Sequence, residues 1–186
     1  MTQSDAEVII LTMNALGAGI LMFVAGVVQK ILDHLDAPDF KRFANLLGKS
    51  AMSDPFAVTV ATLPIIAAPL YFVAYGFKHR WFTAGLVAWL VGSSITKVTN
   101  MPIYDRLANS RYNDTAALLE DRRKLRLANN ARAWVTLVSV LLMACQFGRR
   151  AVVLTTAAAA IVAIPLLWLA REYIPGGVGR MPDSAD

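Results

Sequence analysis

Cysteine is almost absent from this chain: Cys145 is the single one among 186 residues, and it lies inside an apolar run. One thiol can form neither an internal disulfide nor a dithiol relay, which excludes the small helical membrane reductases that exchange disulfides with quinones. Histidine is nearly as scarce, because the chain has only His34 and His79, both in predicted loops on opposite sides of the membrane. A bis-histidine haem or a histidine-rich metal centre is not expected. We therefore predict neither a metal nor a cofactor.

Charged residues and catalytic motifs are also sparse. Only 17% of the residues are charged and 56% are hydrophobic, whereas about a quarter of a soluble domain is charged. The chain contains no HExxH, CxxC or GxSxG motif and no glycine-rich phosphate loop. No acidic residue lies near the centre of an apolar segment, which disfavours a proton-driven pump. The composition favours an integral membrane protein.

Long apolar segments are what the chain does contain. A membrane-spanning helix needs roughly 20 apolar residues. Four segments reach that length, and a shorter fifth is continuous with a polar helical stretch before it. We predict an all-α polytopic membrane protein, an up-and-down four-helix transmembrane bundle plus a fifth C-terminal transmembrane helix. The predicted spans are residues 8–31, 55–77, 81–100, 129–147 and 151–170, within one domain of residues 1–174. Residues 175–186, rich in glycine and proline, are expected to form a disordered tail.

The basic residues predict how the chain is oriented. Most of them lie in the loop of residues 30–54, in the segment between the third and fourth spans, and in the tail. By the positive-inside rule these parts are cytoplasmic, so the protein is a multi-pass protein of the cell membrane with its N-terminus outside and its C-terminus in the cytoplasm. The net charge of +5 then reflects topology and contact with anionic lipid head groups. Membrane lipids are the expected partners, and nucleic acid is not.

Helix boundaries can be placed from capping signals. Ser53 or Asp54 can cap the second predicted helix, with Pro55 at its first position. Asp114 or Thr115 can cap the long helix that enters the fourth span.

Polar side chains gather near the predicted cytoplasmic ends of the spans. The third span carries a polar stripe just before Pro102, which we expect to end that helix: Ser93, Thr96, Lys97 and Asn100. The helix entering the fourth span carries residues spaced by four, with two polar neighbours: Arg122, Arg126, Asn130, then Asn129 and Arg132. The first span ends in Gln29 after a stripe of mostly small residues: Ala15, Gly19, Met22 and Gly26.

Each of these groups also has a purely structural interpretation. Lys97 can extend its ammonium group to the interface, and the arginines can form a lipid-facing basic patch. The small residues are predicted to form a helix-packing face. Asn100 and Asn130 can hold a carbonyl or phenolate oxygen, and they can equally well join two helices.

The order of these features resembles the anthrone oxygenase-like family of small integral membrane proteins. The matching segments are GAGILMFVAGVVQ (17–29), TKVTNMPIYDRLAN (96–109) and LRLANNARAW (125–134). The resemblance covers roughly residues 10–147. It implies a four-helix membrane bundle and oxidation of polycyclic aromatic anthrones by molecular oxygen, without metal or flavin. The implied positions are Asn100, Pro102, Asn109, Arg126, Asn130, Arg132 and Trp134. An aromatic or basic residue that often accompanies the fourth-span motif in the family is replaced here by Ala-Asn-Asn, and a fifth span is added.

Three functions follow as hypotheses. The first is a protein near the cytoplasmic face that binds or oxidises a lipophilic aromatic or quinone-like molecule, as a cofactor-independent oxygenase. Its catalytic candidates are Lys97, Asn100, Asn130 and Arg132, and its ligand-binding candidates are Gln29, Thr96, Asn109, Arg126 and Trp134. The second is a non-enzymatic membrane accessory protein or lipid or quinone binder, as a homo-oligomer or with a membrane partner subunit. The third is a small transporter.

Overall fold

The computed structural model describes residues 2–173, without side-chain detail at positions 60, 61 and 64 and at most positions beyond 148. It divides into two compact units, Met1–Phe147 and Gly148–Asp186. The helices are α1 (Gln3–Phe23), α2 (Gln29–His34), α3 (Ala37–Ser53), α4 (Pro55–Tyr75), α5 (Arg80–Ile95), α6 (Met101–Ala108) and α7 (Thr115–Tyr173). Two π-helical turns join α1 to α2 and α5 to α6: η1 (Val24–Val28) and η2 (Thr96–Asn100).

Three continuous helices are long and apolar enough to cross a membrane: Gln3–His34, Arg80–Ala108 and Thr115–Gly148. The described chain is all-helical, as predicted, and has the helices of an integral membrane protein. The 32 residues of the first of these helices extend about 48 Å, well beyond a hydrocarbon core of ~30 Å. The ends of this helix therefore extend past a hydrocarbon core of that thickness.

The number of spans and their orientation stay predictions. Helix α4 covers the predicted second span, but its apolar stretch among the described residues, Ile65–Tyr75, is short. The predicted fifth span, 151–170, is helical, although most of its side chains lie outside the described set, and the predicted tail, 175–186, lies outside the described residues. Gly148 has non-helical dihedral angles, φ 152° and ψ 99°, so α7 consists of two helices that meet there.

The predicted capping signals are confirmed. The backbone N–H of Ala57 donates to Asp54 Oδ1 over 2.7 Å, with Pro55 in the first turn of α4. The N–H of Ala116 likewise donates to Asp114 Oδ1 over 3.1 Å at the start of α7. Short acidic side chains at these positions satisfy N–H groups that the helix itself leaves free.

The prediction that residues 30–54 form a loop is wrong. The first helix continues to His34, and α3 then occupies 37–53, capped by Asp36, which accepts from the N–H of Asp39 over 2.8 Å. Helix α3 is amphipathic: it buries Phe40 and Ala44 and exposes Asp39, Arg42 and Lys49. Its average hydropathy is therefore too low to be noticed in a search for apolar runs.

The predicted end of the third helix before Pro102 is also wrong. The helix passes through Pro102 and ends at Ala108. Proline has no N–H to donate and its ring crowds the carbonyl four residues earlier, so a regular α-helix is strained there. The π turn η2 relieves this, because the N–H of Met101 bonds the carbonyl of Thr96, five residues earlier.

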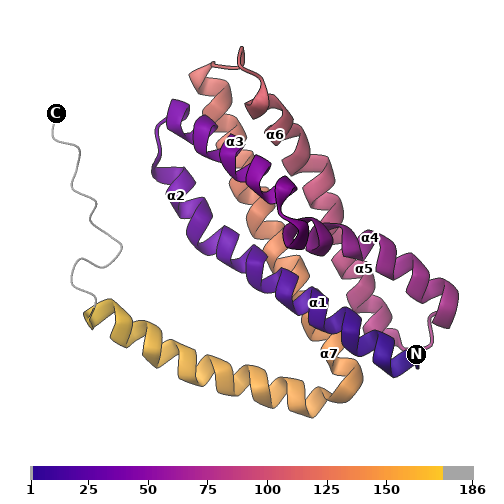
Figure 1. Ribbon diagram of the computed structural model, residues 1–186. Coiled ribbons are helices and arrows are strands. Elements are labelled where there is room, and N and C mark those ends of the chain that lie inside the picture. The colour runs from indigo at the N-terminus through magenta and orange to yellow at the C-terminus, as the bar shows by residue number, and fades with distance from the viewer. Residues whose placement is uncertain (1, 174–186) are drawn as a thin grey trace. The chain divides into compact units, whose positions relative to one another are not determined.

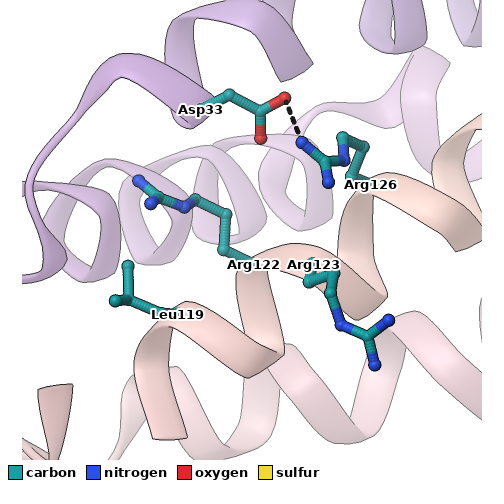
Figure 2. A pocket seen from close by; sticks show the side chains of 5 residues that line it. All are labelled: Asp33, Leu119, Arg122, Arg123 and Arg126. Atoms are coloured by element: carbon teal, nitrogen blue, oxygen red, sulfur yellow. Dashed lines mark hydrogen bonds and ion pairs between the residues drawn. The ribbon is translucent and has the colours of Figure 1, made fainter. Parts of the chain in front are cut away.

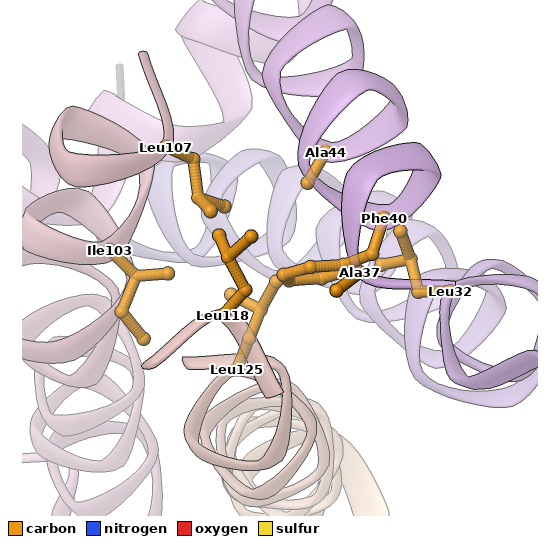
Figure 3. Close-up of a cluster of buried hydrophobic side chains, with 8 residues drawn as sticks. All are labelled: Leu32, Ala37, Phe40, Ala44, Ile103, Leu107, Leu118 and Leu125. Carbon is orange, nitrogen blue, oxygen red and sulfur yellow. The ribbon is translucent and has the colours of Figure 1, made fainter. Parts of the chain in front are cut away.

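Two apolar clusters fill the first unit. One joins α2, α3, α6 and the start of α7 (Figure 3): Leu32, Ala37, Phe40, Ala44, Ile103, Leu107, Leu118 and Leu125. The other joins α1, α4, α5 and a later part of α7: Ile10, Ala68, Tyr71, Phe82, Leu86, Trp89 and Met143. In Figure 1 the first cluster belongs to the end of the bundle at α3 and α6, and the second to the end near the N-terminus.

Helices α5 and α7 approach each other closely at glycines. A Cβ atom at Gly85 would lie 2.5 Å from Met143 Cγ and 2.8 Å from the carbonyl oxygen of Ser139. The small stripe of α1 behaves differently: Gly19 and Gly26 are exposed, and a Cβ there would meet nothing within 4 Å. The predicted packing face of α1 is therefore wrong within the described chain. The inward face instead carries Asn14, whose Nδ2 donates to Ser139 Oγ over 2.7 Å.

Candidate functional site

A layer of buried polar side chains separates the two apolar clusters. Asn100 Nδ2 donates to Asn129 Oδ1 over 2.9 Å, and Asn129 Nδ2 donates to Gln29 Oε1 over 2.8 Å. These three amides come from η2, α7 and α2, and each is at most 1% exposed. Asn129 therefore bridges two helices in the interior of the bundle. We call these amides, together with Thr96 and Arg132, the polar layer.

Both π-helical turns end at this layer. Turn η1 ends at Val28, directly before Gln29, and η2 ends at Asn100. A π turn adds one residue to a helix and is common at functional sites. On the first helix, the buried Glu7 and Asn14 are one heptad apart, and Gln29 follows Glu7 by three heptads plus one residue. The extra residue of η1 accounts for this offset and returns Gln29 to the inward face.

A second contact joins η2 to α7 beside the amides. One terminal nitrogen of Arg132 donates to Thr96 Oγ1 over 3.1 Å. Two atoms of the polar layer are buried without a hydrogen-bond partner among the described residues: Asn100 Oδ1, an acceptor, and Arg132 Nε, a donor. Asn100 and Arg132 each take part in a hydrogen bond between η2 and α7, and these two bonds lie one helical turn apart along each helix. The layer therefore has hydrogen-bonding capacity that the protein itself does not use.

An arginine-rich pocket of about 150 Å³ lies beyond the layer, toward the start of α7. It is lined by Asp33, Leu119, Arg122, Arg123 and Arg126. Figure 2 shows Arg122 and Arg126 extending toward the side of α7 where Asp33 lies, while Arg123 turns away. Arg123 is held by Glu120: its Nε donates to Oε2 over 2.8 Å, and a terminal nitrogen donates to Oε1 over 2.9 Å.

Asp33 connects the pocket to the polar layer. Its Oδ1 accepts from Gln29 Nε2 over 3.0 Å, and its Oδ2 lies 3.5 Å from a terminal nitrogen of Arg126. A continuous sequence of hydrogen-bonded side chains thus runs from Asn100 through the amides to the pocket. The contact between Asp33 and Arg126 is the longest in this sequence, so Arg126 is the side chain that it holds most weakly.

The predicted site residues fall into two sets. Gln29, Thr96, Asn100 and Arg132 come together in the polar layer, and Arg126 lies in the pocket. Lys97 and Trp134 are exposed on the outside of their helices. Asn130 is exposed as well, and its Nδ2 donates to the carbonyl of Arg126 on its own helix. Asn109 lies in the loop before α7, where its Oδ1 accepts from the backbone N–H of Arg111 over 3.0 Å.

The amide that faces Asn100 belongs to Asn129, which the sequence pattern had placed only beside the stripe. Residues spaced by four drift by about 40° at each step around a helix of 3.6 residues per turn. Asn130, two such steps after Arg122, therefore lies on a different face of the helix from Arg122. A heptad spacing drifts less, and Asn129, Thr136 and Met143 are all buried. That spacing was the signal that could have identified Asn129.

A second polar cluster, at the N-terminal end of α1, was also missed. Glu7 is 1% exposed, and its Oε1 accepts from the hydroxyl of Tyr71 and lies 2.6 Å from His79 Nδ1. Gln3 Nε2 contacts Glu7 Oε1 over 3.2 Å and the Tyr71 hydroxyl over 3.0 Å. These residues come from α1, α4 and the loop before α5, so only the tertiary structure brings them together. The cluster joins three chain segments at this end of the bundle.

The loop before α7 is fixed by one charged cluster. Asp121 accepts from Arg106 Nε over 3.0 Å and from the Tyr112 hydroxyl over 2.9 Å. Burial, together with the hydrogen bond to Asp121, raises the pKa of Tyr112. Lys41 Nζ donates to the carbonyls of Asn109 and Tyr112, each over 2.8 Å, so α3 holds the same loop.

Comparison with known proteins adds no assignment to this geometry. No protein-family model, curated protein or solved structure matches the chain.

Proposed function

We propose that this integral membrane protein binds a lipophilic molecule with a carbonyl oxygen, of the aromatic or quinone-like class, at the polar layer. The observation that supports the proposal is the pair of buried, unpaired atoms, Asn100 Oδ1 and Arg132 Nε. A buried donor or acceptor without a partner costs about 1–3 kcal/mol, and more when it is charged. A ligand oxygen that accepts from Arg132 removes that cost.

The chemistry of the layer suits such a ligand. Arg132 Nε–H is a charged donor, and a carbonyl or phenolate oxygen can accept a hydrogen bond from it. Asn100 Oδ1 is an acceptor that a phenolic hydroxyl can pair with. Thr96 and Asn129 hold these two side chains through bonds of 3.1 and 2.9 Å, so both groups are oriented before a ligand arrives.

The family resemblance supports the same ligand class, since the anthrone oxygenase-like proteins act on polycyclic aromatic carbonyl compounds. Our proposal stops at binding. The polar layer consists of three amides, a hydroxyl and an arginine, and it includes no carboxylate or imidazole that could take a proton from a substrate. Lys97 and Asn130, predicted as catalytic, are exposed to the outside.

The competing proposal is a structural layer in a non-enzymatic accessory protein. It is favoured by the amides themselves, because Gln29, Asn100 and Asn129 bond to one another in a packed interface. In that case an ordered water would pair with the two free atoms, as is common at buried polar sites.

Binding of a hydroxynaphthoquinone, which offers a carbonyl oxygen to Arg132 Nε and a hydroxyl to Asn100 Oδ1, to the protein in phosphatidylcholine nanodiscs separates these proposals. A ligand at a hundredfold excess over its Kd stabilises a protein by about 2.7 kcal/mol. We expect this stabilisation, measured by thermal unfolding in the nanodiscs, for the wild type and for R126Q, an arginine variant outside the layer. We expect none for N100A or R132Q.

The infrared carbonyl band of the bound quinone provides a measurement that does not depend on folding of the variants. A hydrogen bond from Arg132 should shift this band to lower frequency in the wild type, relative to the quinone in empty nanodiscs. Equal stabilisation of all four proteins, or an unshifted carbonyl band, would show that the quinone only partitions into the bilayer and would leave the layer a structural role.

A further inference from the structure

We propose that the arginine-rich pocket on α7 is a binding site for a phosphate group, presented by the head group of an anionic phospholipid. Asp33 links this pocket to the polar layer, but the proposal does not require a carbonyl ligand to bind there. Its size, its charge and its surroundings each point to this chemistry.

The size of the pocket selects a small group. Sites for drug-sized ligands usually have volumes of about 300–1,000 Å³, whereas this pocket measures about 150 Å³. It can therefore take one compact anionic group rather than a whole aromatic molecule.

The charge of the pocket selects an anion. Arg122 and Arg126 face the pocket together with one carboxylate, Asp33, so its lining is positive overall, while the third lining arginine, Arg123, is paired with Glu120. The guanidinium group presents a planar fork of donors that matches the oxygens of a phosphate better than the point charge of a lysine does.

One of these arginines is held ready for a ligand. A terminal nitrogen of Arg122 donates to the carbonyls of Leu32 and Leu35, at 3.3 and 2.5 Å, near the end of α2. Backbone carbonyls at the C-terminal end of a helix have no partner within the helix. Here they accept hydrogen bonds from Arg122 and so hold its side chain in place. Its other nitrogens have no hydrogen-bond partner among the described residues, so they can pair with an anion, and less side-chain entropy is lost when one binds.

The second arginine is held loosely and can change partner. Arg126 lies 3.5 Å from Asp33, which also accepts from Gln29. A phosphate would compete with the Asp33 carboxylate for Arg126, while Asp33 would keep its bond to Gln29. Removing the charge of Asp33 should therefore strengthen binding.

The surroundings favour a lipid as the source of the phosphate. Leu119 lines the pocket and is 40% exposed, and Ile31 and Leu127 close by in sequence are exposed too. A soluble phosphate ester needs no apolar surface, whereas the acyl chains of a lipid do. Basic residues at the cytoplasmic side of a span are the usual partners of anionic head groups.

Native mass spectrometry of the protein from nanodiscs of phosphatidylcholine with a small share of phosphatidylglycerol tests the site. We expect the double variant R122Q/R126Q to bind phosphatidylglycerol about thirtyfold more weakly than the wild type, from about 1 kcal/mol for each basic residue. The control K49Q/R111Q removes the same charge from the same predicted side of the membrane, and it should lose less than threefold. An equal loss in both double variants would mean general surface attraction and would overturn the site.

A second pair of variants keeps the test decisive if loss of Arg122 disturbs folding. D33N should bind phosphatidylglycerol about fivefold more tightly, because it removes the competing charge. D105N removes an exposed carboxylate of α6 outside the pocket and should change binding less than twofold. Equal effects of the two substitutions, or no bound phosphatidylglycerol in the wild type, would refute the proposal. Competition by millimolar inorganic phosphate would identify a soluble phosphate ester as the source, and its failure would identify the lipid.

Discussion

Replacing Asn129 by alanine should break the polar layer at its centre. Asn129 accepts from Asn100 and donates to Gln29, so the substitution removes two hydrogen bonds between helices. It also leaves Asn100 Nδ2 and Gln29 Oε1 without these partners in the interior of the bundle.

The loss of stability can be estimated from these two bonds. Hydrogen bonds between membrane helices contribute about 0.6 kcal/mol each on average, while buried groups left unpaired cost about 1–3 kcal/mol. We therefore expect N129A to destabilise the protein by about 1–3 kcal/mol. That is a factor of roughly 5 to 150 in the equilibrium constant of unfolding, at 1.4 kcal/mol for each tenfold.

The adjacent asparagine provides a matched control. Asn130 lies on the same helix, but it is exposed, and within the described part of the chain its side chain bonds only to the backbone of Arg126. Any gain in helix propensity on replacing asparagine by alanine is the same at both positions. The difference between N129A and N130A therefore isolates the bonds between helices.

The assay is reversible unfolding by SDS in mixed micelles, followed by circular dichroism. N130A should match the wild type within about 0.5 kcal/mol, as expected of an exposed substitution. If both variants had the same stability, or if N130A were the weaker, the amide ladder would not stabilise the bundle and our placement of Asn129 would be refuted.

Three further predictions concern packing and the loop before α7. G85A should destabilise the protein by about 1–3 kcal/mol, because the new Cβ would lie 2.5 Å from a methionine side chain; G19A, which meets nothing within 4 Å, should be neutral or stabilising in the same SDS titration. K41M should speed proteolysis of the loop that Lys41 holds, whereas K49M should not, and equal cleavage in both would contradict this anchoring. The raised pKa of Tyr112 means that its contribution to stability is complete below pH ~10 and is lost as the pH rises through the folded pKa. Tyrosinate absorbance and unfolding at alkaline pH should show this loss in the wild type, and Y112F should lose less stability over the same pH range.

Much of the secondary structure follows from local chemistry. The caps at Asp54 and Asp114 form as predicted, since a short acidic side chain satisfies the first free N–H groups of a helix wherever the helix lies. The prediction failed at Pro102, because a π turn relieved the strain that normally ends a helix at proline. It failed at α3 because average hydropathy does not register an amphipathic helix.

The candidate site was predicted only in part. Gln29, Asn100 and Arg132 were identified because polar groups near the ends of apolar helices are few. Their partner was misplaced by one residue, since a spacing of four and a spacing of seven diverge on a helix after two turns. The Glu7, Tyr71 and His79 cluster joins residues far apart in the chain, and no local pattern indicates such a contact.

The sequence by itself determined that this is an all-helical membrane protein, because long apolar segments can satisfy their backbone hydrogen bonds in lipid only as helices. It also determined where most of the polar groups lie along those helices. The tertiary structure alone decided which of them turn inward: two π turns change the phase of their helices, and Asn129 rather than Asn130 meets Asn100. A side chain faces the interior according to its angle around the helix, and one added residue or one step along the chain changes that angle by about 100°.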